Sequence, residues 1–151
     1  MQVPECAFCL VDQKRNPILK DGRLVFVVLS NKRLILGHTL VIPKRHVSTL
    51  AELSNDERLE LFETAIHFQE KIKALWSLTG AGCDLSQHDR PFMRNTPAAR
   101  SGLAVPEHLH IHLRPRIWQD EYYERVLRHE TSMFAEPNFE ELQRMVNLLG
   151  E

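Results

Sequence analysis

Three histidines occupy alternate positions in the segment 107–114, which reads EHLHIHLR. Side chains alternate between the two faces of a β-strand, so a strand here has one apolar face and one imidazole face. Imidazole titrates near neutral pH and is a good nucleophile. The face that carries His108, His110 and His112 therefore belongs in a functional site. The alternative, an edge strand that is merely rich in histidine, requires strict register by chance.

A catalytic metal ion is a competing interpretation of this row. At about 3.4 Å per residue, His108 and His112 lie roughly 13 Å apart along an extended strand. Metal–nitrogen bonds are only about 2.0 Å long, so one ion binds all three rings only if both ends lean in sharply. A metallohydrolase site in which two of the three histidines and a distant residue bind one ion remains an alternative.

Cysteine offers a second chemistry near the N-terminus. Cys6 and Cys9 form a C-x-x-C pair, and Cys83 is alone. The segment MQVPECAFC has no positive region followed by an apolar stretch, so we expect no signal peptide and a cytoplasmic location. In such a chain the pair favours a metal site or a redox dithiol over structural disulfides.

Length, composition and net charge limit the class of protein and its partners. The chain has 151 residues, of which 43% are hydrophobic and 26% charged, as in a soluble domain. A net charge of −1 provides no overall basic field, so we expect no nucleic-acid partner. The longest apolar run, residues 24–29, is too short to span a bilayer, so we expect no membrane partner.

The elements that position the histidines can be predicted from turn signals and periodicity. Asp21-Gly22 is typical of a type I′ turn, which predicts a hairpin within residues 17–30. Residues 24–29 are apolar on both faces and indicate a central strand. Residues 38–43 indicate another strand that ends at Pro43. The segment 31–37 between them is predicted to be a loop.

Ser54 and Glu57 form a capping box that opens a predicted helix to about Leu78. We expect its core stripe to consist of Leu59, Phe62, Ile66, Ile72 and Leu75. Residues 83–86 can form a short strand, and residues 87–105 read as a long binding loop. The tail from residue 120 to residue 151 has two helical segments interrupted near Pro137. The fold class is therefore α+β, an antiparallel sheet with a long helix packed on it and a C-terminal helical tail.

Two segments together resemble the histidine triad (HIT) family of nucleotide hydrolases and transferases. They are GHTLVIPKRH, residues 37–46, and HLHIHLRPR, residues 108–116. The family signature is His-φ-His-φ-His-φ-φ, where φ is apolar, and here Arg114 replaces the final φ. With the N-terminal CAFC the resemblance spans residues 6–116. It implies a single HIT-like domain over residues 1–151, with a core at 6–116 and a helical extension at 117–151.

The resemblance also implies roles for the histidines. His110 would be the nucleophile that attacks the α-phosphorus of a nucleotide and forms a covalent intermediate. Its other ring nitrogen then needs an acceptor, which a backbone carbonyl of the same strand could provide. His112 would donate to phosphate oxygens or to the departing group, and His38 resembles the fourth active-site histidine of the family.

Some family members carry a structural zinc ion at positions that match Cys6, Cys9, His46 and His108 here. The ion would tie the N-terminal segment to the strand beside the nucleophile. It would also reserve His108 for binding metal, leaving His110 and His112 for chemistry. A redox dithiol remains the alternative for the cysteine pair.

Nucleotide-binding residues also follow from motif positions. Phe8, Val11 and Leu40 resemble residues that enclose the base, although plain core packing would explain them too. Asn31 lies near the position of a ribose-binding Asp or Asn.

The chain departs from the family just before the triad. Members often carry a Gly-Gln-Ser/Thr-Val stretch whose polar groups contact phosphate. Here Ser101 and Gly102 remain, but Leu103 and Ala104 stand where Gln and Ser or Thr are expected. We expect Gln87, Arg90 and Arg94 to supply substitute phosphate contacts, since arginine suits bidentate binding of phosphate. Arg114 could reach the rim of the site, and His88 is expected at the surface.

The sequence thus predicts a zinc-containing hydrolase or transferase that acts on a nucleoside phosphoramidate or a dinucleoside polyphosphate. Mg²⁺ could accompany a polyphosphate substrate, and the family resemblance implies a homodimer. Two alternatives stay open, a nucleotide-binding adaptor with weak or no catalysis and a metallohydrolase.

Overall fold

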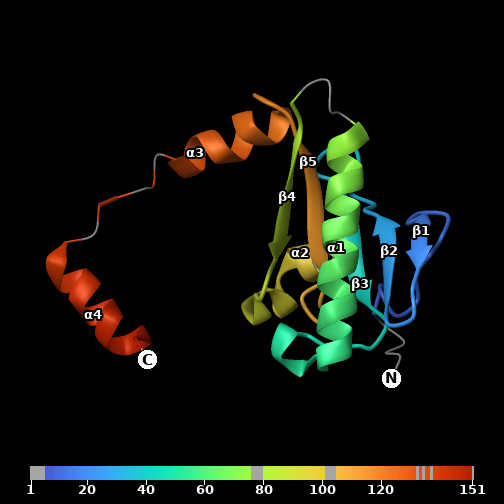
Figure 1. Cartoon of the computed structure of the whole chain (residues 1–151), viewed down its shortest axis with the longest axis horizontal. Coiled ribbons are helices and arrows are strands. Elements are labelled where there is room, and N and C mark those ends of the chain that lie inside the picture. The colour runs from blue at the N-terminus through green and yellow to red at the C-terminus, as the bar shows by residue number, and fades with distance from the viewer. Residues whose placement is uncertain are drawn as a thin grey trace. The chain divides into compact units, whose positions relative to one another are not determined.

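The computed structural model describes residues 6–75, 80–100, 105–131, 133, 135–136 and 138–150. The chain divides into two compact units, residues 1–118 and residues 119–151. The first unit contains the sheet and the long helix (Figure 1). The second contains only helices among its described residues.

The first unit is built on a five-stranded antiparallel sheet in the order β1-β2-β3-β5-β4. Its strands are β1 (Ile18–Asp21), β2 (Val25–Leu29), β3 (Thr39–Pro43), β4 (Gly82–Gln87) and β5 (Ile111–Arg116). The predicted strand at residues 24–29 is interior, because β2 pairs on both sides. The four residues Val25 to Val28 are buried, as a run that is apolar on both faces requires.

The β1–β2 hairpin is present, but its predicted type I′ turn is wrong. The strands end at Asp21 and resume at Val25, so the connection has three residues rather than two. Gly22 also lacks the positive φ that a type I′ turn requires. The backbone N–H of Gly22 donates to the carbonyl of Val25, and a carboxylate oxygen of Glu60 accepts from the backbone N–H groups of Leu24 and Val25. A Cβ at Gly22 would lie 2.7 Å from that oxygen, so close approach explains this glycine.

Helix α1 (Asn55–Leu75) lies across one face of the sheet (Figure 1). Its capping box is confirmed, because the N–H of Ser54 donates to Glu57 and the N–H of Glu57 donates to the hydroxyl of Ser54. A short 3₁₀-helix, Leu50–Glu52, precedes it. The predicted end near Leu78 lies outside the described residues.

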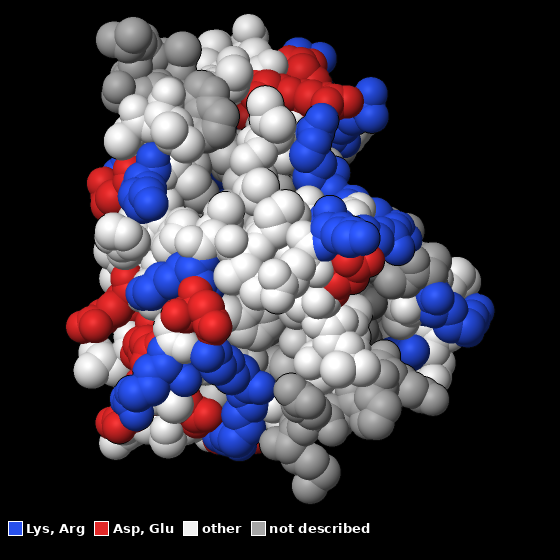
Figure 2. Space-filling model, turned by 90° about the vertical axis from the view of Figure 1, so that its right-hand side faces the viewer, with Lys and Arg blue, Asp and Glu red and all other residues white. Residues whose placement is uncertain are grey.

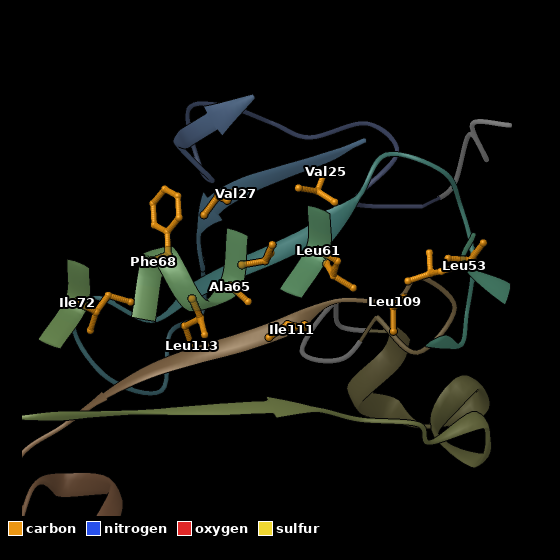
Figure 3. Close-up of a cluster of buried hydrophobic side chains, with 12 residues drawn as sticks. Val25, Val27, Leu53, Leu61, Ala65, Phe68, Ile72, Leu109, Ile111 and Leu113 are labelled. Carbon is orange, nitrogen blue, oxygen red and sulfur yellow. The ribbon is translucent and has the colours of Figure 1, made fainter. Parts of the chain in front are cut away.

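The predicted core stripe of α1 is wrong except at Ile72. Leu59, Phe62, Ile66 and Leu75 are exposed, with Leu59 at 60% and Ile66 at 54%. The buried face instead carries Leu61, Ala65, Phe68 and Ile72, which pack on the strands (Figure 3). Both sets recur at helical spacing, so periodicity alone could not choose the face that meets the sheet.

The alternation predicted for residues 107–114 is confirmed across both faces of the sheet. Leu109, Ile111 and Leu113 belong to the core beneath α1 (Figure 3). The histidines lie on the opposite face, where a smaller apolar cluster consists of Phe26, Val28, Leu40 and Ile42. Strand pairing itself begins only at Ile111, so His108 and His110 precede β5 and His112 lies within it.

The segment predicted as a long loop after β4 contains two short helices. They are a 3₁₀-helix at Pro91–Asn95 and α2 at Pro97–Arg100. A proline begins each of them, where its fixed φ is compatible with the first helical turn. Much of the described part of this segment is therefore helical.

The second unit confirms two helical segments in the tail. A π-helix at Tyr123–Leu127 continues into α3 (Arg128–Thr131), and α4 spans Phe139–Leu149. Asn138 caps α4 by accepting from the N–H of Glu141, while the Glu141 carboxylate accepts from the N–H of Asn138. Pro137 itself lies outside the described residues.

The surface carries charges of both signs. Lys and Arg side chains are interspersed with Asp and Glu over the face shown in Figure 2. Within the described part of the chain, no helix combines the length and hydropathy needed to cross a membrane.

Candidate active site

His110 has one ring nitrogen committed to the backbone. Its Nδ1 lies 2.8 Å from the carbonyl oxygen of His108, and because a carbonyl only accepts, Nδ1 carries the proton. The neutral ring then has an unprotonated Nε2. Burial lowers the pKa of His110, so this nitrogen keeps its lone pair near pH 7. His110 is therefore arranged as a nucleophile or a ligand, with the backbone acceptor that the sequence analysis required.

His112 has the opposite tautomer, because of a hydrogen-bond chain that begins at the backbone. The N–H of Leu34 donates to Nδ1 of His38 over 3.2 Å, so the proton of His38 is on Nε2. That nitrogen donates over 2.9 Å to Nδ1 of His112. Nε2 of His112 therefore carries a hydrogen and is a donor. The two neighbouring histidines are set as acceptor and donor, respectively.

These rings are kept neutral by their surroundings. Burial, assisted by the charges of Arg114 and His110, lowers the pKa of His38 to about 4. Burial is also the main reason that the pKa of His112 falls to about 2, with the neighbouring histidines and Arg114 adding to it. A cation near a titrating imidazole disfavours its protonated form. At neutral pH the tautomers above therefore persist.

A cavity of about 370 Å³ lies in front of these histidines. This volume is within the range of small-molecule sites. Residues singled out from the sequence that line it are Phe8, Asn31, His38, Leu40, Arg90, His110 and His112. The ring of Phe8 meets the ring of His110 edge-on, with centroids 5.0 Å apart. The structure thus brings the three proposed catalytic histidines and four proposed nucleotide contacts to one cavity.

Four other predicted nucleotide contacts are not in this lining. Val11 packs with Phe8 against the smaller apolar cluster. Gln87 ends β4 and pairs with Ile111. An Arg94 nitrogen, Nη2, lies 3.4 Å from the hydroxyl of Ser48. Ser101, with the neighbouring Gly102, Leu103 and Ala104, lies outside the described residues.

Several lining residues were not anticipated. They are Ala7, Asn16, Ser30, Lys32, Leu34, His88, Met93, Ala98, Val105 and Pro106. Ser30 and Lys32 flank the predicted Asn31. Lys32 has a φ of 62°, a backbone conformation that is uncommon for residues other than glycine. Lys32 and Arg90 are the cations of the lining, and none of the described residues that line the cavity is acidic.

His88 is exposed, as expected, and it also lines the cavity, which was not expected. Its ring centroid lies 4.9 Å from that of His112, and the planes are tilted by 35°. His38 lies 5.1 Å from His112 at a similar tilt. A usable signal existed in the sequence, because Asp84, Ser86 and His88 alternate as the triad does.

Arg114 was expected near the rim, but its side chain is buried beside the strands. Only 7% of the residue is exposed, and its Nη2 donates to the hydroxyl of Ser86 on β4. It is not among the residues that line the cavity. Its charge lowers the pKa of three histidines near the cavity, His38, His88 and His112, although burial is the larger cause for each.

A second group of ligand-type side chains, which we call the metal group, consists of Cys6, Cys9, His46 and His108. Their potential ligand atoms all lie within 4.8 Å of one another. Sγ of Cys6 is 3.3 Å from Nδ1 of His108, and Sγ of Cys9 is 3.3 Å from Nδ1 of His46. In a tetrahedral site with bonds of about 2.0 and 2.3 Å, such atoms are about 3.5 Å apart. The donor set and its spacing therefore fit a bound metal ion.

The backbone around the metal group fixes the side that each ligand presents. Nε2 of His108 lies 2.9 Å from the carbonyl oxygen of Pro43, so it carries the proton and Nδ1 is left to bind metal. The backbone N–H groups of Cys9 and Leu10 both donate to the carbonyl of Cys6, which folds the two thiols toward each other. Burial raises the pKa of the Cys6 thiol, so the thiol keeps its proton at neutral pH. A divalent cation that bound here would displace this proton.

Arg45 connects His46 of the metal group to the start of α1. Its guanidinium donates to both carboxylate oxygens of Glu57 and to the carbonyl of Glu52. The pKa of Glu57 falls to about 2, mainly because of this hydrogen bonding. The capping residue of α1 thus also orders the segment that carries His46.

Comparison with known proteins identifies the family. A family model described as the HIT domain matches residues 12–117. A curated HIT-like protein of Borreliella burgdorferi is 27% identical over 118 residues, covering 77% of this chain and 78% of that protein. The asymmetrical bis(5′-nucleosyl)-tetraphosphatase of Schizosaccharomyces pombe is 29% identical over 85 residues, 56% of this chain and 41% of that protein.

Solved structures extend the likeness to the fold. A HIT-family protein of Bacillus subtilis superposes with a TM-score of 0.69 at 21% identity, covering 96% of this chain and 94% of that one. A protein of Streptococcus mutans UA159 gives a TM-score of 0.66 at 27% identity, covering 96% and 83%. The predicted architecture of sheet, long helix and C-terminal helix is thereby confirmed.

Proposed function

The chain belongs to the HIT family, and from this premise we propose that it is a nucleotide hydrolase or nucleotidyltransferase that forms a covalent intermediate on His110. Its substrate would be a nucleoside phosphoramidate or a dinucleoside polyphosphate. The name of the tetraphosphatase relative supports nucleotide hydrolysis in general. The observation that carries the proposal is the tautomer of His110, whose Nδ1–H is held by the carbonyl of His108.

The proposed reaction has two displacements. In the first, Nε2 of His110 attacks the α-phosphorus, a P–N bond forms, and the bond to the leaving group breaks with its electron pair. The ring then carries a positive charge, which the hydrogen bond from Nδ1 to the carbonyl of His108 stabilises. In the second, an oxygen of water or of another acceptor attacks the phosphorus. The P–N bond breaks, Nε2 recovers its lone pair, and a proton leaves the attacking oxygen.

His112 has the geometry to stabilise the transferred group. Its Nε2–H is a donor that the hydrogen bond from His38 holds in place. Non-bridging oxygens of a phosphoryl group in transfer carry the charge that such donors stabilise. Phe8 and Leu40 would enclose the base, with Val11 behind Phe8, and Asn31 would contact the ribose.

We also propose that the metal group binds zinc in a structural role. Two thiols and two imidazoles are the donor set that tetrahedral zinc prefers. His108 would ligate through Nδ1 while its carbonyl orients His110, so the ion would fix the nucleophile without contacting substrate. This arrangement favours a structural ion over the metallohydrolase alternative. That Mg²⁺ accompanies a polyphosphate substrate remains a prediction. The cytoplasmic location also remains a prediction.

A homodimer is the assembly that we propose. Strand β4 pairs on one side only among the described strands, so its outer edge can accept a strand from a second copy. The exposed apolar residues Leu59, Phe62 and Ile66 of α1 provide further surface for such contact. Sedimentation equilibrium would measure the mass directly.

The test of the catalytic proposal is a trapped intermediate. The protein is mixed with an adenosine phosphoramidate or diadenosine tetraphosphate, quenched in alkali, and digested. Mass spectrometry should find an adenylyl group on the peptide that contains residues 108–112 and none in His110→Ala. Turnover without any adduct would refute the covalent route.

The adaptor alternative is favoured by one sequence feature, the replacement of polar phosphate contacts by Leu103 and Ala104. It predicts nucleotide binding without turnover, equal in the wild type and in His110→Ala. Calorimetric titration with AMP beside a turnover assay separates it from the hydrolase.

A further inference from the structure

We infer that His88 and Arg90 form a subsite for the phosphates of the leaving group, so that the enzyme prefers a dinucleoside polyphosphate over a phosphoramidate. The inference rests on the proposed function, because it names which of the two substrate classes the same site takes. Neither residue lies in the triad motif. Both line the cavity.

The sheet register explains why His88 faces the cavity. Ser86 pairs with His112 across β4 and β5, and its hydroxyl accepts from Arg114 on the same face. Side chains two residues apart on a strand share a face. Continuing the alternation past the end of β4 brings His88 to the histidine face. The ring contact of 4.9 Å between His88 and His112 agrees with this placement.

The position of His88 relative to His112 indicates what it would contact. The His112 ring contacts two other imidazoles, His38 at a centroid distance of 5.1 Å and His88 at 4.9 Å. His38 is occupied by hydrogen bonds at both nitrogens, to Leu34 and to His112. No hydrogen bond joins His88 to another described residue, and its ring lines the cavity. It can therefore donate to an oxygen of a bound group that passes His112.

Arg90 supplies charge at the same end of the cavity. It follows His88 by two residues, lines the cavity and is exposed. No described carboxylate forms an ion pair with it, unlike Arg116, which is paired with Asp84. Its charge is strong enough at His88 to help lower the pKa of that ring, after burial. A cation that is not neutralised by the protein is suited to a polyanionic ligand.

The chemistry of departure points the same way. An amine that leaves a phosphoramidate must take up a proton, whereas a polyphosphate chain can depart as an anion. The pKa of His38 is about 4 and that of His112 about 2, and the pKa of His88 is also lowered by burial. These three rings are therefore neutral at pH 7, so that His88 and His112 can donate hydrogen bonds to the leaving group but seldom a proton, while His38 donates to His112. Neutral donors with a nearby arginine stabilise an anionic leaving group.

The experiment compares kcat/KM for diadenosine tetraphosphate and for adenosine phosphoramidate in the wild type and in five variants, Arg90→Ala, His88→Ala, His88→Gln, Arg94→Ala and Arg100→Ala. Arg90→Ala and His88→Ala should lower the value for the tetraphosphate by about 10- to 100-fold, as expected for lost charge-assisted contacts. The value for the phosphoramidate should change by less than about threefold. His88→Gln, which keeps an N–H donor, should recover part of the loss. Arg100→Ala is the matched control, because Arg100 belongs to the same segment and donates to the carbonyl of Asn95.

Three results would overturn the inference. They are equal losses on both substrates, no loss on either, and a selective loss in Arg94→Ala that is absent in Arg90→Ala. The fold of each variant is checked by its thermal midpoint.

Binding is measured alongside, so that failure of the catalytic proposal can be told apart. If the wild type turns over neither substrate, calorimetry with adenosine tetraphosphate and AMP still tests the subsite. Adenosine tetraphosphate should then bind at least about 10-fold more tightly than AMP, and Arg90→Ala should remove this difference in affinity. Equal affinities for the two ligands in the wild type would refute the subsite.

Discussion

His108 and His110 lie two residues apart on the same face of the molecule, yet they are left with different free nitrogens. His108 gives its Nε2–H to the carbonyl of Pro43, so Nδ1 faces the thiols. His110 gives its Nδ1–H to the carbonyl of His108, so Nε2 is available to the cavity. One backbone acceptor per ring therefore decides which nitrogen is left free, Nδ1 of His108 for the proposed metal ion and Nε2 of His110 for the proposed attack on phosphorus.

The two ends of the row also differ in what surrounds them. His108 is 1% exposed and lies among side chains that fit a metal ion. His110 and His112 are only partly buried and border an open cavity. The metal group should thus contribute mostly to stability, and the histidines at the cavity mostly to rate.

The largest expected effect on rate is that of His110→Ala. Removing the attacking nitrogen should lower kcat/KM by about 10⁴-fold or more, as for other nucleophiles that act with a positioned partner. The thermal midpoint should move by only a few degrees, because the ring is partly exposed. Initial rates and a melting curve on the same preparation measure both. A large loss of stability would mean that the two ends are one structural unit.

The largest expected effect on stability is that of metal removal. A strong chelator, or Cys6→Ser, should lower the thermal midpoint by about 10 °C or more, because binding at a structural site is coupled to folding. The rate should fall only as the protein unfolds. Cys83→Ser is the matched control, since Cys83 lies outside the metal group. A loss of rate at an unchanged midpoint would instead indicate a catalytic ion.

A smaller effect is expected when the tautomer of His112 is disturbed. His38→Ala removes the donor to Nδ1 of His112, so the ring is free to change its tautomer and orientation. We expect kcat to fall by about 10²-fold with little change in KM. His38→Gln, which retains an N–H donor, should recover part of kcat. Equal kcat in both variants would show that the hydrogen bond does not position His112.

The sequence was sufficient to predict which residues share a face but not which partners fix their protons. Alternation in residues 108–113 separated core from site correctly, because a strand has only two faces. A backbone carbonyl of the same strand was expected to hold His110, but that it belongs to His108, and that the carbonyl of Pro43 holds His108, could not be predicted, since both depend on where the backbone turns before β5 begins. The tautomers, on which the chemistry depends, can therefore be assigned only from the folded structure.

One error and one omission have physical causes that are specific to these residues. The core stripe of α1 was wrong because the helix carries two apolar stripes, and only one meets the sheet. The place of His88 in the cavity lining was missed because the segment after β4 was treated as a loop without periodicity. Extending the alternation of Asp84 and Ser86 by one step would have predicted its face.

The smallest expected effect concerns pH and Arg114. The positive charge of Arg114 helps to lower the pKa of His38 and of His112, after burial, so its removal should raise both. The pKa of each histidine is lower in the folded protein than in the unfolded chain, where it is about 6.5. The stability and activity that depend on the neutral rings are therefore fully present above about pH 6.5 and are lost as the pH falls through the folded pKa. In Arg114→Met the acid limb of kcat/KM should therefore move to higher pH, with a rate about twofold below that of the wild type at pH 5 and an equal rate at pH 8. The pH at which the metal ion is released should be the same in Arg114→Met and in the wild type, because Arg114 is not among the charges that act on His108. If the pH of metal release and the acid limb of kcat/KM moved together, protonation at the metal group, rather than at the cavity, would limit activity in acid.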